Sequence, residues 1–346
     1  MPVNTSRTTY REHTDTENIL KLRQVLSTLP AFCKDYFRAI DSTTTTKIRI
    51  FFQFLLDENP VFKNYAMTDF SVDVLDQIKA IDLEEYMEYL KVYQNGDKTE
   101  TNGERGLKRK ISALRSFYAY YYKREMIHSN PTVLIDVPKI HDKSIIRLDT
   151  DEVALLLDYI EHCGDSLTGQ KRVYYEKTKE RDLAIVTLLL GTGIRVSECV
   201  GLDIEDVDFK NNGIKVTRKG GNEMVVYFGE EVEKALKRYL EVRAGITPLA
   251  GHEHALFYSA QRKRMGVQAV ENMVKKYSRQ ITTTKKITPH KLRSTYGTAL
   301  YQETGDIYLV ADVLGHKDVN TTKKHYAALD DARRRQAATA VRLRED

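Results

Sequence analysis

Apolar side chains recur at helical spacing along most of this chain. Thr43–Leu56 starts with hydroxyl residues that can cap a helix and continues with apolar residues on one face, which predicts a helix with a buried side. Leu83–Tyr93 predicts a second, shorter helix, and the polar stretch Gln94–Arg105, which holds two glycines, predicts a loop. Gly106–Arg124 then predicts a third helix, in which one broad apolar stripe is flanked by basic residues. The first part of the chain is therefore expected to be helical.

The second part of the chain is predicted to add one strand pair to further helices. Asp149–Glu152 precede an apolar-periodic run that ends at Ile160, which is typical of a capped helix. After a polar insert, Gly164–Glu176, an apolar helix is predicted over Glu180–Leu190. Gly213–Phe228 alternates apolar and polar residues around a glycine-rich turn, which predicts a β-hairpin. The remaining pattern is helical, so the fold is predicted to be mainly α with a small β-hairpin or sheet.

The length of the chain favours two domains. At 346 residues it exceeds the usual size of a single hydrophobic core. Asn130-Pro131 ends the third helix, and an extended, charged stretch follows from Val137 to Ile146. We therefore predict one domain over residues 1–140, a linker over 141–147 and a second domain over 148–346.

Composition adds limits to this outline. The balance of 41% hydrophobic and 30% charged residues is that of a globular protein, and the longest apolar stretch, Leu183–Leu190, is too short to span a bilayer. The N-terminus lacks the pattern of a secretory signal, so a cytoplasmic location without membrane contact is expected. Cys33, Cys163 and Cys199 are odd in number and far apart, which favours neither a disulfide framework nor paired zinc ligands. A net charge of +5 leans basic but does not by itself indicate a nucleic-acid partner.

Several polar residues stand where they could bind an anion. Arg195 follows a glycine turn at the start of a helix, and Glu198 lies one helical turn further, where it can pair with that arginine. His290 and Arg293 are three residues apart and so share one helix face, from which both can address one phosphate. His316 stands in Leu-Gly-His, and Tyr326 follows it. Taken singly, these residues also fit surface charge, an exposed helix start and a packing tyrosine.

Their order, however, resembles the catalytic domain of tyrosine recombinases, the family of Xer proteins and phage integrases. The chain carries, in sequence, an arginine, a lysine in a hairpin, His-x-x-Arg, Leu-Gly-His and a tyrosine, over roughly residues 148–330. The first half is similar to the core-binding domain of the family through Arg109–Tyr118 and Ser129–Pro131. The resemblance implies a helical (SAM-like) core-binding domain that binds DNA, followed by a mixed α/β catalytic domain.

The resemblance also implies a role for each matching residue. Arg195 and Arg293 would clamp the scissile phosphate, and Lys219 would be the general acid for the leaving 5′-hydroxyl. His290 and His316 would take hydrogen-bonding and proton-transfer roles, and Glu198 would support the site. Tyr326 would be the nucleophile that forms a covalent 3′-phosphotyrosine bond with DNA. No metal ion or other cofactor is implied by this scheme.

Three features depart from the family pattern or compete with it. Arg293 is followed by Ser294-Thr295 where many members have His-Thr, which should have little effect because the position is beside the clamp. His316 and Tyr326 are separated by one residue more than in the common Xer pattern, which leaves the helical phase of the tyrosine open. Tyr301 and Tyr308 are rival nucleophiles in principle, but they precede Leu-Gly-His and are out of order.

The partner implied by the resemblance is double-stranded DNA with an inverted-repeat recombination site. A homodimer on one site and a homotetramer in the synaptic complex are implied, and the helix-prone tail Ala327–Asp346 is a candidate for docking on a neighbouring protomer. Candidate phosphate contacts in the first domain are the basic residues of the third helix: Lys108, Arg109, Lys110, Arg115, Lys123 and Arg124.

Alternative functions remain open at this point. They are a DNA-binding relative that has lost catalysis, a type IB topoisomerase-like activity that relaxes DNA, and, more remotely, a helical protein-interaction domain. Within recombinases, Xer-like resolution of chromosome dimers competes with integration or excision of a mobile element. Residues 179–186 and 217–221 resemble the single-recombinase Xer proteins of some Gram-positive bacteria, and no additional arm-binding domain is recognised at the N-terminus, which favours the Xer role.

Overall fold

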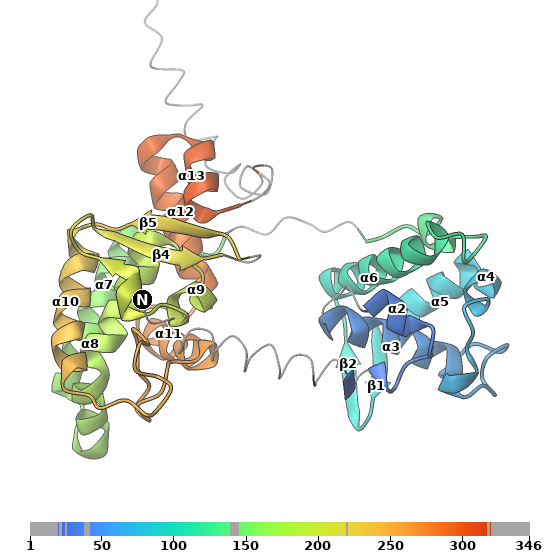
Figure 1. The fold of residues 1–346 in the computed structure, drawn as a ribbon, viewed down its shortest axis with the longest axis horizontal. Coiled ribbons are helices and arrows are strands. Elements are labelled where there is room, and N and C mark those ends of the chain that lie inside the picture. The colour runs from blue at the N-terminus through green and yellow to red at the C-terminus, as the bar shows by residue number, and fades with distance from the viewer. Residues whose placement is uncertain are drawn as a thin grey trace, which may run out of the picture. The chain divides into compact units, whose positions relative to one another are not determined.

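A computed structural model of the chain describes residues 20, 23, 24, 26–37, 42–138, 145–218, 221–316 and 319. The chain divides into two compact units after residue 142 (Figure 1). Each unit has its own apolar core. The predicted domain limits and the linker over 141–147 include residues outside this description, so they stay predictions. The predicted tail Ala327–Asp346 also lies outside the described residues.

The first unit is a small helical bundle with one strand pair. Its elements in chain order are α2 (Cys33–Phe37), α3 (Ser42–Asp57), α4 (Val74–Gln77), α5 (Ala80–Tyr89), β1 (Val92–Asn95), β2 (Lys98–Thr101) and α6 (Glu104–Tyr122). The helices predicted over Thr43–Leu56 and Gly106–Arg124 are confirmed as α3 and α6, which pack against each other. Their contact is aromatic, because Phe52 of α3 packs edge-on to Phe117 of α6 at 6.1 Å between ring centroids.

The segment after α5 corrects two predictions. The helix predicted over Leu83–Tyr93 stops at Tyr89, and the loop predicted over Gln94–Arg105 is in fact mostly an antiparallel hairpin, β1–β2. Gly96 has a φ of +62° in the turn, a conformation that glycine adopts without strain. Every residue of β2 is exposed, so no alternation of apolar and polar residues marks the strand.

The second unit packs around the buried C-terminal part of one helix, α8 (Gly169–Thr192). Its elements in chain order are α7 (Thr150–His162), α8 (Gly169–Thr192), α9 (Val196–Val200), β3 (Val207–Asp208), β4 (Gly213–Thr217), β5 (Glu223–Tyr227), α10 (Glu230–Ala244), α11 (Val267–Ile281), α12 (Pro289–Thr304) and α13 (Ile307–Leu314). Helix α8 packs against α7, α9, α10 and α12. Its stretch Leu183–Leu189 is buried on every side, as expected for a helix that is apolar all round.

The helix predicted over Glu180–Leu190 is longer than expected and includes most of the predicted polar insert Gly164–Glu176, which is a further correction. Helix α8 starts at Gly169, well before the predicted Glu180. Its first turns are mostly exposed, and they are fixed by Tyr175, whose hydroxyl donates to the carbonyl of Ile160 at 3.0 Å. Tyr175 also occupies the space that a Cβ on Gly164 would need, with its ring 2.2 Å from that position. One tyrosine therefore joins the start of α8 to the end of α7.

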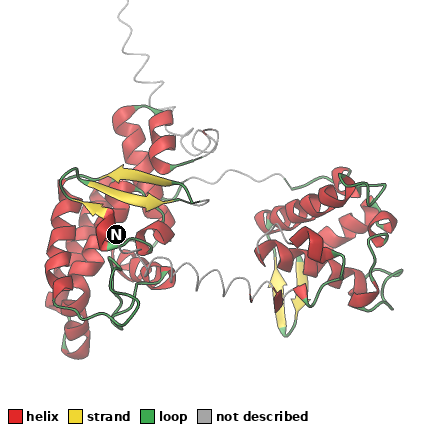
Figure 2. Ribbon diagram, in the orientation of Figure 1, coloured by secondary structure: helices red, strands yellow, loops and turns green. Residues whose placement is uncertain are grey.

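The predicted hairpin over Gly213–Phe228 is confirmed, and β3 adds a third strand that was not predicted (Figure 2). The predicted helix cap at Asp149 is also present, because its backbone N–H donates to the carboxylate of Glu152 at 2.8 Å. The segment 245–266 between α10 and α11 is not helical, contrary to the expected pattern. The fold is thus mainly helical with small sheets, as predicted. None of the helices described here is long and apolar enough to cross a membrane.

Candidate active site

A glycine turn sets the start of α9. Gly193 ends α8 with a φ of +61° and donates its N–H to the carbonyl of Leu189. A Cβ at this position would lie 2.4 Å from Tyr296 Cδ1, so the turn requires glycine for two independent reasons. Because the turn is fixed, Arg195 stands at the N-cap of α9.

Arg195 is held by Glu198. The backbone N–H of Arg195 donates to Glu198 Oε2 at 2.8 Å, and its Nη1 donates to Glu198 Oε1 at 2.7 Å. The predicted ion pair is therefore present. The carboxylate is buried, whereas 37% of the Arg195 side chain is exposed. A partly exposed guanidinium with a buried counter-charge is oriented but still accessible to an anion.

Arg293 lies on α12 and is buried. Its Nη1 donates to the carbonyl of Gly193 and its Nη2 to the carbonyl of Leu314. These partners come from the end of α8 and the end of α13. The planar guanidinium therefore ties both helix ends to α12, which a lysine with a single ammonium group cannot do in the same way.

The end of α13 leads into His316. The N–H of Gly315 donates to the carbonyl of Asp312 at 2.7 Å, and the N–H of His316 donates to the carbonyl of Ala311 at 2.9 Å. These two bonds form a Schellman motif. Gly315 has a φ of +61°, and Arg195 Nη2 donates to its carbonyl at 3.4 Å. The motif Leu314-Gly315-His316 is thus a fixed turn in contact with Arg195.

A third arginine, not selected from the sequence, reaches the same turn. Arg218 follows β4, and its Nη1 and Nη2 donate to the carbonyls of Leu314 and Val313 at 2.5 and 2.7 Å. Burial lowers the pKa of Arg218, and the positive charge of Arg195 lowers it further, while Glu198 opposes the change. No local pattern reveals this contact, because it joins residues almost one hundred positions apart.

The C-terminal end of α13 thereby gathers positive charge. Arg195, Arg218 and Arg293 all donate to carbonyls of residues 313–315. The carbonyl end of a helix carries partial negative charge, which stabilises cations placed there. The arrangement can present guanidinium groups to a phosphate at a position fixed by backbone.

The remaining predicted residues are placed unequally. His290 is exposed in the first turn of α12, and His316 is half-buried after α13. Lys219 and Tyr326 lie outside the described residues. Of the rival tyrosines, Tyr301 is buried against Val310 and Leu314, whereas Tyr308 is 71% exposed. In the described part of the chain, no group of three or more His, Cys, Asp or Glu side chains is arranged to hold a metal ion.

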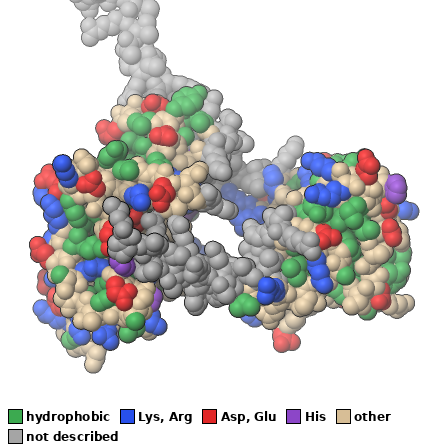
Figure 3. Space-filling view, viewed as in Figure 1, with side chains coloured by type: hydrophobic (Ala, Val, Ile, Leu, Met, Phe, Trp, Pro, Cys, Tyr) green, Lys and Arg blue, Asp and Glu red, His purple; other side chains and the backbone are tan. Residues whose placement is uncertain are grey.

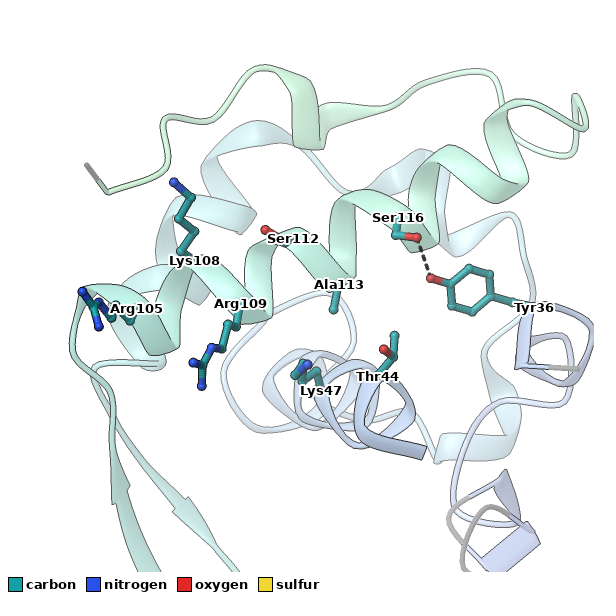
Figure 4. Close-up of a pocket in the computed structure, with 9 residues that line it drawn as sticks. All are labelled: Tyr36, Thr44, Lys47, Arg105, Lys108, Arg109, Ser112, Ala113 and Ser116. Carbon is teal, nitrogen blue, oxygen red and sulfur yellow. Dashed lines mark hydrogen bonds between the residues drawn. The ribbon is translucent and has the colours of Figure 1, made fainter. Parts of the chain in front are cut away.

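The first unit contains a separate basic groove. Its volume is about 600 Å³, and it is lined by Tyr36, Thr44, Lys47, Arg105, Lys108, Arg109, Ser112, Ala113 and Ser116. Four of these nine residues are basic and none is acidic. Lys47 comes from α3, while Arg105, Lys108 and Arg109 come from the first turns of α6; at the other end, Tyr36 donates to Ser116 at 3.0 Å (Figure 4). Lys47 and Arg105 were not predicted.

The other basic residues predicted on α6 lie elsewhere. Arg115 donates to the carbonyls of Thr132 and Ile135 at 3.0 and 2.8 Å, so it anchors the segment after α6. Lys110 donates to Asn102, while Arg124 stacks on a tyrosine ring and Lys123 is exposed just beyond the helix. In the view of Figure 3, Lys and Arg side chains are scattered among acidic ones on both units. The groove is therefore distinguished by its local charge.

Known proteins give the family of the chain. Residues 147–333 match the model of the Phage integrase family. The tyrosine recombinase XerC of Caldanaerobacter subterraneus subsp. tengcongensis is 30% identical, with 90% of this chain and 86% of that protein covered. XerS of Streptococcus uberis is 29% identical, with 90% and 95% covered.

Solved structures agree in fold. The XerH site-specific recombinase in its post-cleavage complex with palindromic difH substrate has a TM-score of 0.62 at 21% identity, covering 86% of this chain and 78% of that one. A lambda integrase dimer bound to a core site has a TM-score of 0.56 at 16% identity, covering 83% and 89%. The chain therefore belongs to the phage integrase family and is an enzyme of the tyrosine recombinase class, a site-specific recombinase of the Xer type.

Proposed function

We propose that this recombinase cuts DNA with Tyr326 and holds the broken strand as a 3′-phosphotyrosine. The observation that carries the proposal is the convergence of Arg195 and Arg293 on the turn that leads to His316. Two guanidinium groups from distant helices on one turn suit a reaction in which negative charge develops on phosphate oxygens.

The chemistry assigns a step to each residue. The Tyr326 oxygen attacks the scissile phosphorus, and the bond from phosphorus to the 5′-oxygen breaks. Arg195 and Arg293 stabilise the non-bridging oxygens, with Glu198 as support for Arg195. Lys219 gives a proton to the leaving 5′-oxygen, and His290 and His316 assist through hydrogen bonds and proton transfer.

The products explain why the reaction can be reversed without an energy source. The phosphodiester is exchanged for a phosphotyrosine ester, so the number of phosphate ester bonds is unchanged. A 5′-hydroxyl from the same or another DNA strand can then attack the phosphorus and release Tyr326. Tyrosine has a reference pKa of about 10, so its attack at neutral pH needs the positive field of the arginines or a proton acceptor.

DNA binding by the first unit is assigned to the basic groove. Lys47, Arg105, Lys108 and Arg109 give it four positive charges, and the hydroxyls of Ser112 and Ser116 add hydrogen-bonding groups. Such a surface suits phosphates, which are bound by cations and hydroxyl groups without reading the base sequence. Lys123 and Arg124 remain candidates at the far end of α6, whereas Arg115 and Lys110 are better explained by their contacts within the unit.

The proposed assembly is a homodimer on one inverted-repeat site and a homotetramer when two sites meet. Support comes from the lambda integrase structure, which is a dimer on a core site, and from XerH structures with bound difH substrate. The biological role we favour is resolution of chromosome dimers, because XerS relatives match this chain over nearly their whole length. Movement of a mobile element is the competing role.

Two experiments test these assignments. DNA labelled at its 5′ end and cut by the protein should carry the label in the protein adduct and leave a free 5′-hydroxyl on the other fragment; the reverse polarity would refute the 3′-phosphotyrosine. Covalent adducts mapped across the genome of the source cell should fall at one chromosomal inverted repeat. Adducts at the ends of a mobile element would establish the integrase role, and relaxation of plasmids without any site would favour a topoisomerase.

A further inference from the structure

Arg218 joins the β4–β5 hairpin to the turn that carries His316. Besides its bonds to the carbonyls of Val313 and Leu314, its Nε donates to the sulfur of Met224 on β5. Leu314 also accepts from Arg293, so two arginines share one carbonyl group. The side chain is half-buried, and its charge lies against the negative end of α13.

The lack of a side chain at Gly315 leaves the space that the guanidinium group of Arg218 occupies. A Cβ on Gly315 would lie 1.8 Å from Arg218 Nη1 and 2.3 Å from its Cζ. The guanidinium group therefore occupies the space that any other side chain at 315 would enter. The positive φ of Gly315 is a second constraint, and the two together fix where the backbone turns toward His316.

We infer that Arg218 is a positioning residue, which holds the Leu314-Gly315-His316 turn in place and so sets the position from which His316 acts. The inference rests on the proposed function for the role of His316, but the contact of Arg218 with the turn does not. Arg218 itself need not touch DNA, because its Nε, Nη1 and Nη2 donate to a thioether and to two backbone carbonyls of the protein. Loss of Arg218 should therefore loosen the turn and slow cleavage without weakening DNA binding.

The variant Arg218→Met removes the hydrogen-bond donors and keeps much of the length of the side chain. Arg243→Met is the matched control, since Arg243 is also half-buried in the second unit and donates to the carbonyls of Glu253, Ala255 and Leu256. These bonds of Arg243 do not involve the turn at residues 314–316. A general loss of stability would therefore affect both variants, whereas a local effect on the turn is expected only from Arg218→Met.

The first measurement is hydrogen exchange of the full-length protein without DNA. The amides of Gly315 and His316 donate to carbonyls of α13, so opening of the turn exposes them to exchange. We expect roughly tenfold faster exchange of residues 311–316 in Arg218→Met and no local change there in Arg243→Met. Equal protection of this segment in wild type and Arg218→Met would overturn the inference.

The second measurement is single-turnover cleavage in a double-mutant cycle. With His316 present, Arg218→Met should slow adduct formation by roughly 10²-fold, as expected when a reacting group is displaced. In a His316→Ala background the same change should cost no more than about twofold, because the group that Arg218 positions is already absent. Arg218→Lys should recover part of the rate.

These measurements distinguish a failure of the positioning role of Arg218 from a failure of the proposed function. Additive effects of Arg218→Met and His316→Ala, or weaker DNA binding with unchanged exchange at 311–316, would refute positioning and make Arg218 a DNA contact or a general stabiliser. Absence of any adduct from wild type would refute the proposed function, and hydrogen exchange would then decide alone whether Arg218 holds the turn.

Discussion

Arg195 and Glu198 bind each other twice, once through the backbone N–H of the arginine and once through its guanidinium group, at 2.8 and 2.7 Å. The first bond caps α9 and the second orients the side chain. One buried carboxylate therefore shapes the start of the helix and aims the cation that the helix presents.

The change Glu198→Gln should separate these two effects. Glutamine can still accept from the backbone N–H of Arg195, but it lacks the negative charge that holds the guanidinium group. We expect adduct formation to slow by roughly 10²-fold, because the clamp is misplaced. Single-turnover cleavage on a nicked substrate measures this rate. The exposed Glu231→Gln on α10 is the control, and an unchanged rate in Glu198→Gln would show that the pair is not needed.

The change Arg293→Lys keeps the positive charge and removes the planar guanidinium group with its two donating nitrogens. A lysine cannot donate to the carbonyls of Gly193 and Leu314 in the same geometry, so both helix ends lose a fixed partner. We expect cleavage to fall by about 10²–10³-fold, the usual effect of losing one preorganised donor to a reacting oxyanion. Binding to DNA, measured by titration, should stay within about tenfold of wild type. Cleavage at the wild-type rate would exclude Arg293 as a clamp.

The same substitution should have different effects at two arginines of α6: it should change DNA binding at one and protein stability at the other. Arg109→Gln, in the groove, should reduce the salt dependence of DNA binding by about one unit of slope without lowering the melting temperature. Arg115→Gln should leave the slope unchanged and destabilise the protein by about 1–3 kcal/mol, since two backbone carbonyls lose their donor. Titrations at several salt concentrations and thermal unfolding measure both effects. A reversed result would show that the groove is not where DNA binds.

Local sequence patterns predict those features whose residues are close together along the chain. Helix α6 and the pair of Arg195 with Glu198 depend on residues close in sequence, and both were predicted. Arg105 was missed because the predicted helix started at Gly106, although Arg105 shares helical spacing with Lys108 and Arg109.

Other features depend on distant partners. Nothing near Arg218 in sequence indicates that it reaches the end of α13. The β1–β2 hairpin was missed for a different reason: β2 is exposed throughout and β1 buries only Tyr93, so the two strands carry no alternating pattern of apolar and polar residues. The order of motifs identified the family, and the tertiary contacts show what holds those motifs together.

A hydrogen-bonded carboxylate in the first unit should make the stability of the protein depend on pH in the acid range. Asp76 accepts from the backbone N–H groups of His128 and Ser129 at 2.8 and 2.9 Å and from both of their side chains. Burial tends to raise its pKa, but these hydrogen bonds together lower it below its ordinary value of 3.8. Because the folded pKa is depressed, the stabilisation is complete above the unfolded value and is lost as the pH falls through the folded one.

The change Asp76→Ala should therefore cost about 1–2 kcal/mol at neutral pH. The difference from wild type should shrink as the pH falls below 3.8, which thermal unfolding at several pH values would measure. Glu85→Ala, an exposed carboxylate on α5, is the control. A difference that grows toward acid pH would contradict the assignment.

The central claim is that Tyr326 is the nucleophile, and a suicide substrate tests it most directly. A duplex carrying the mapped recombination site, with a nick beside the scissile phosphate, traps the covalent adduct as a band of higher mass. Tyr308→Phe is the matched control, because Tyr308 is an exposed tyrosine of the same unit. We predict an adduct with wild type and Tyr308→Phe, and none with Tyr326→Phe on DNA that it still binds. An adduct formed by Tyr326→Phe would contradict the account.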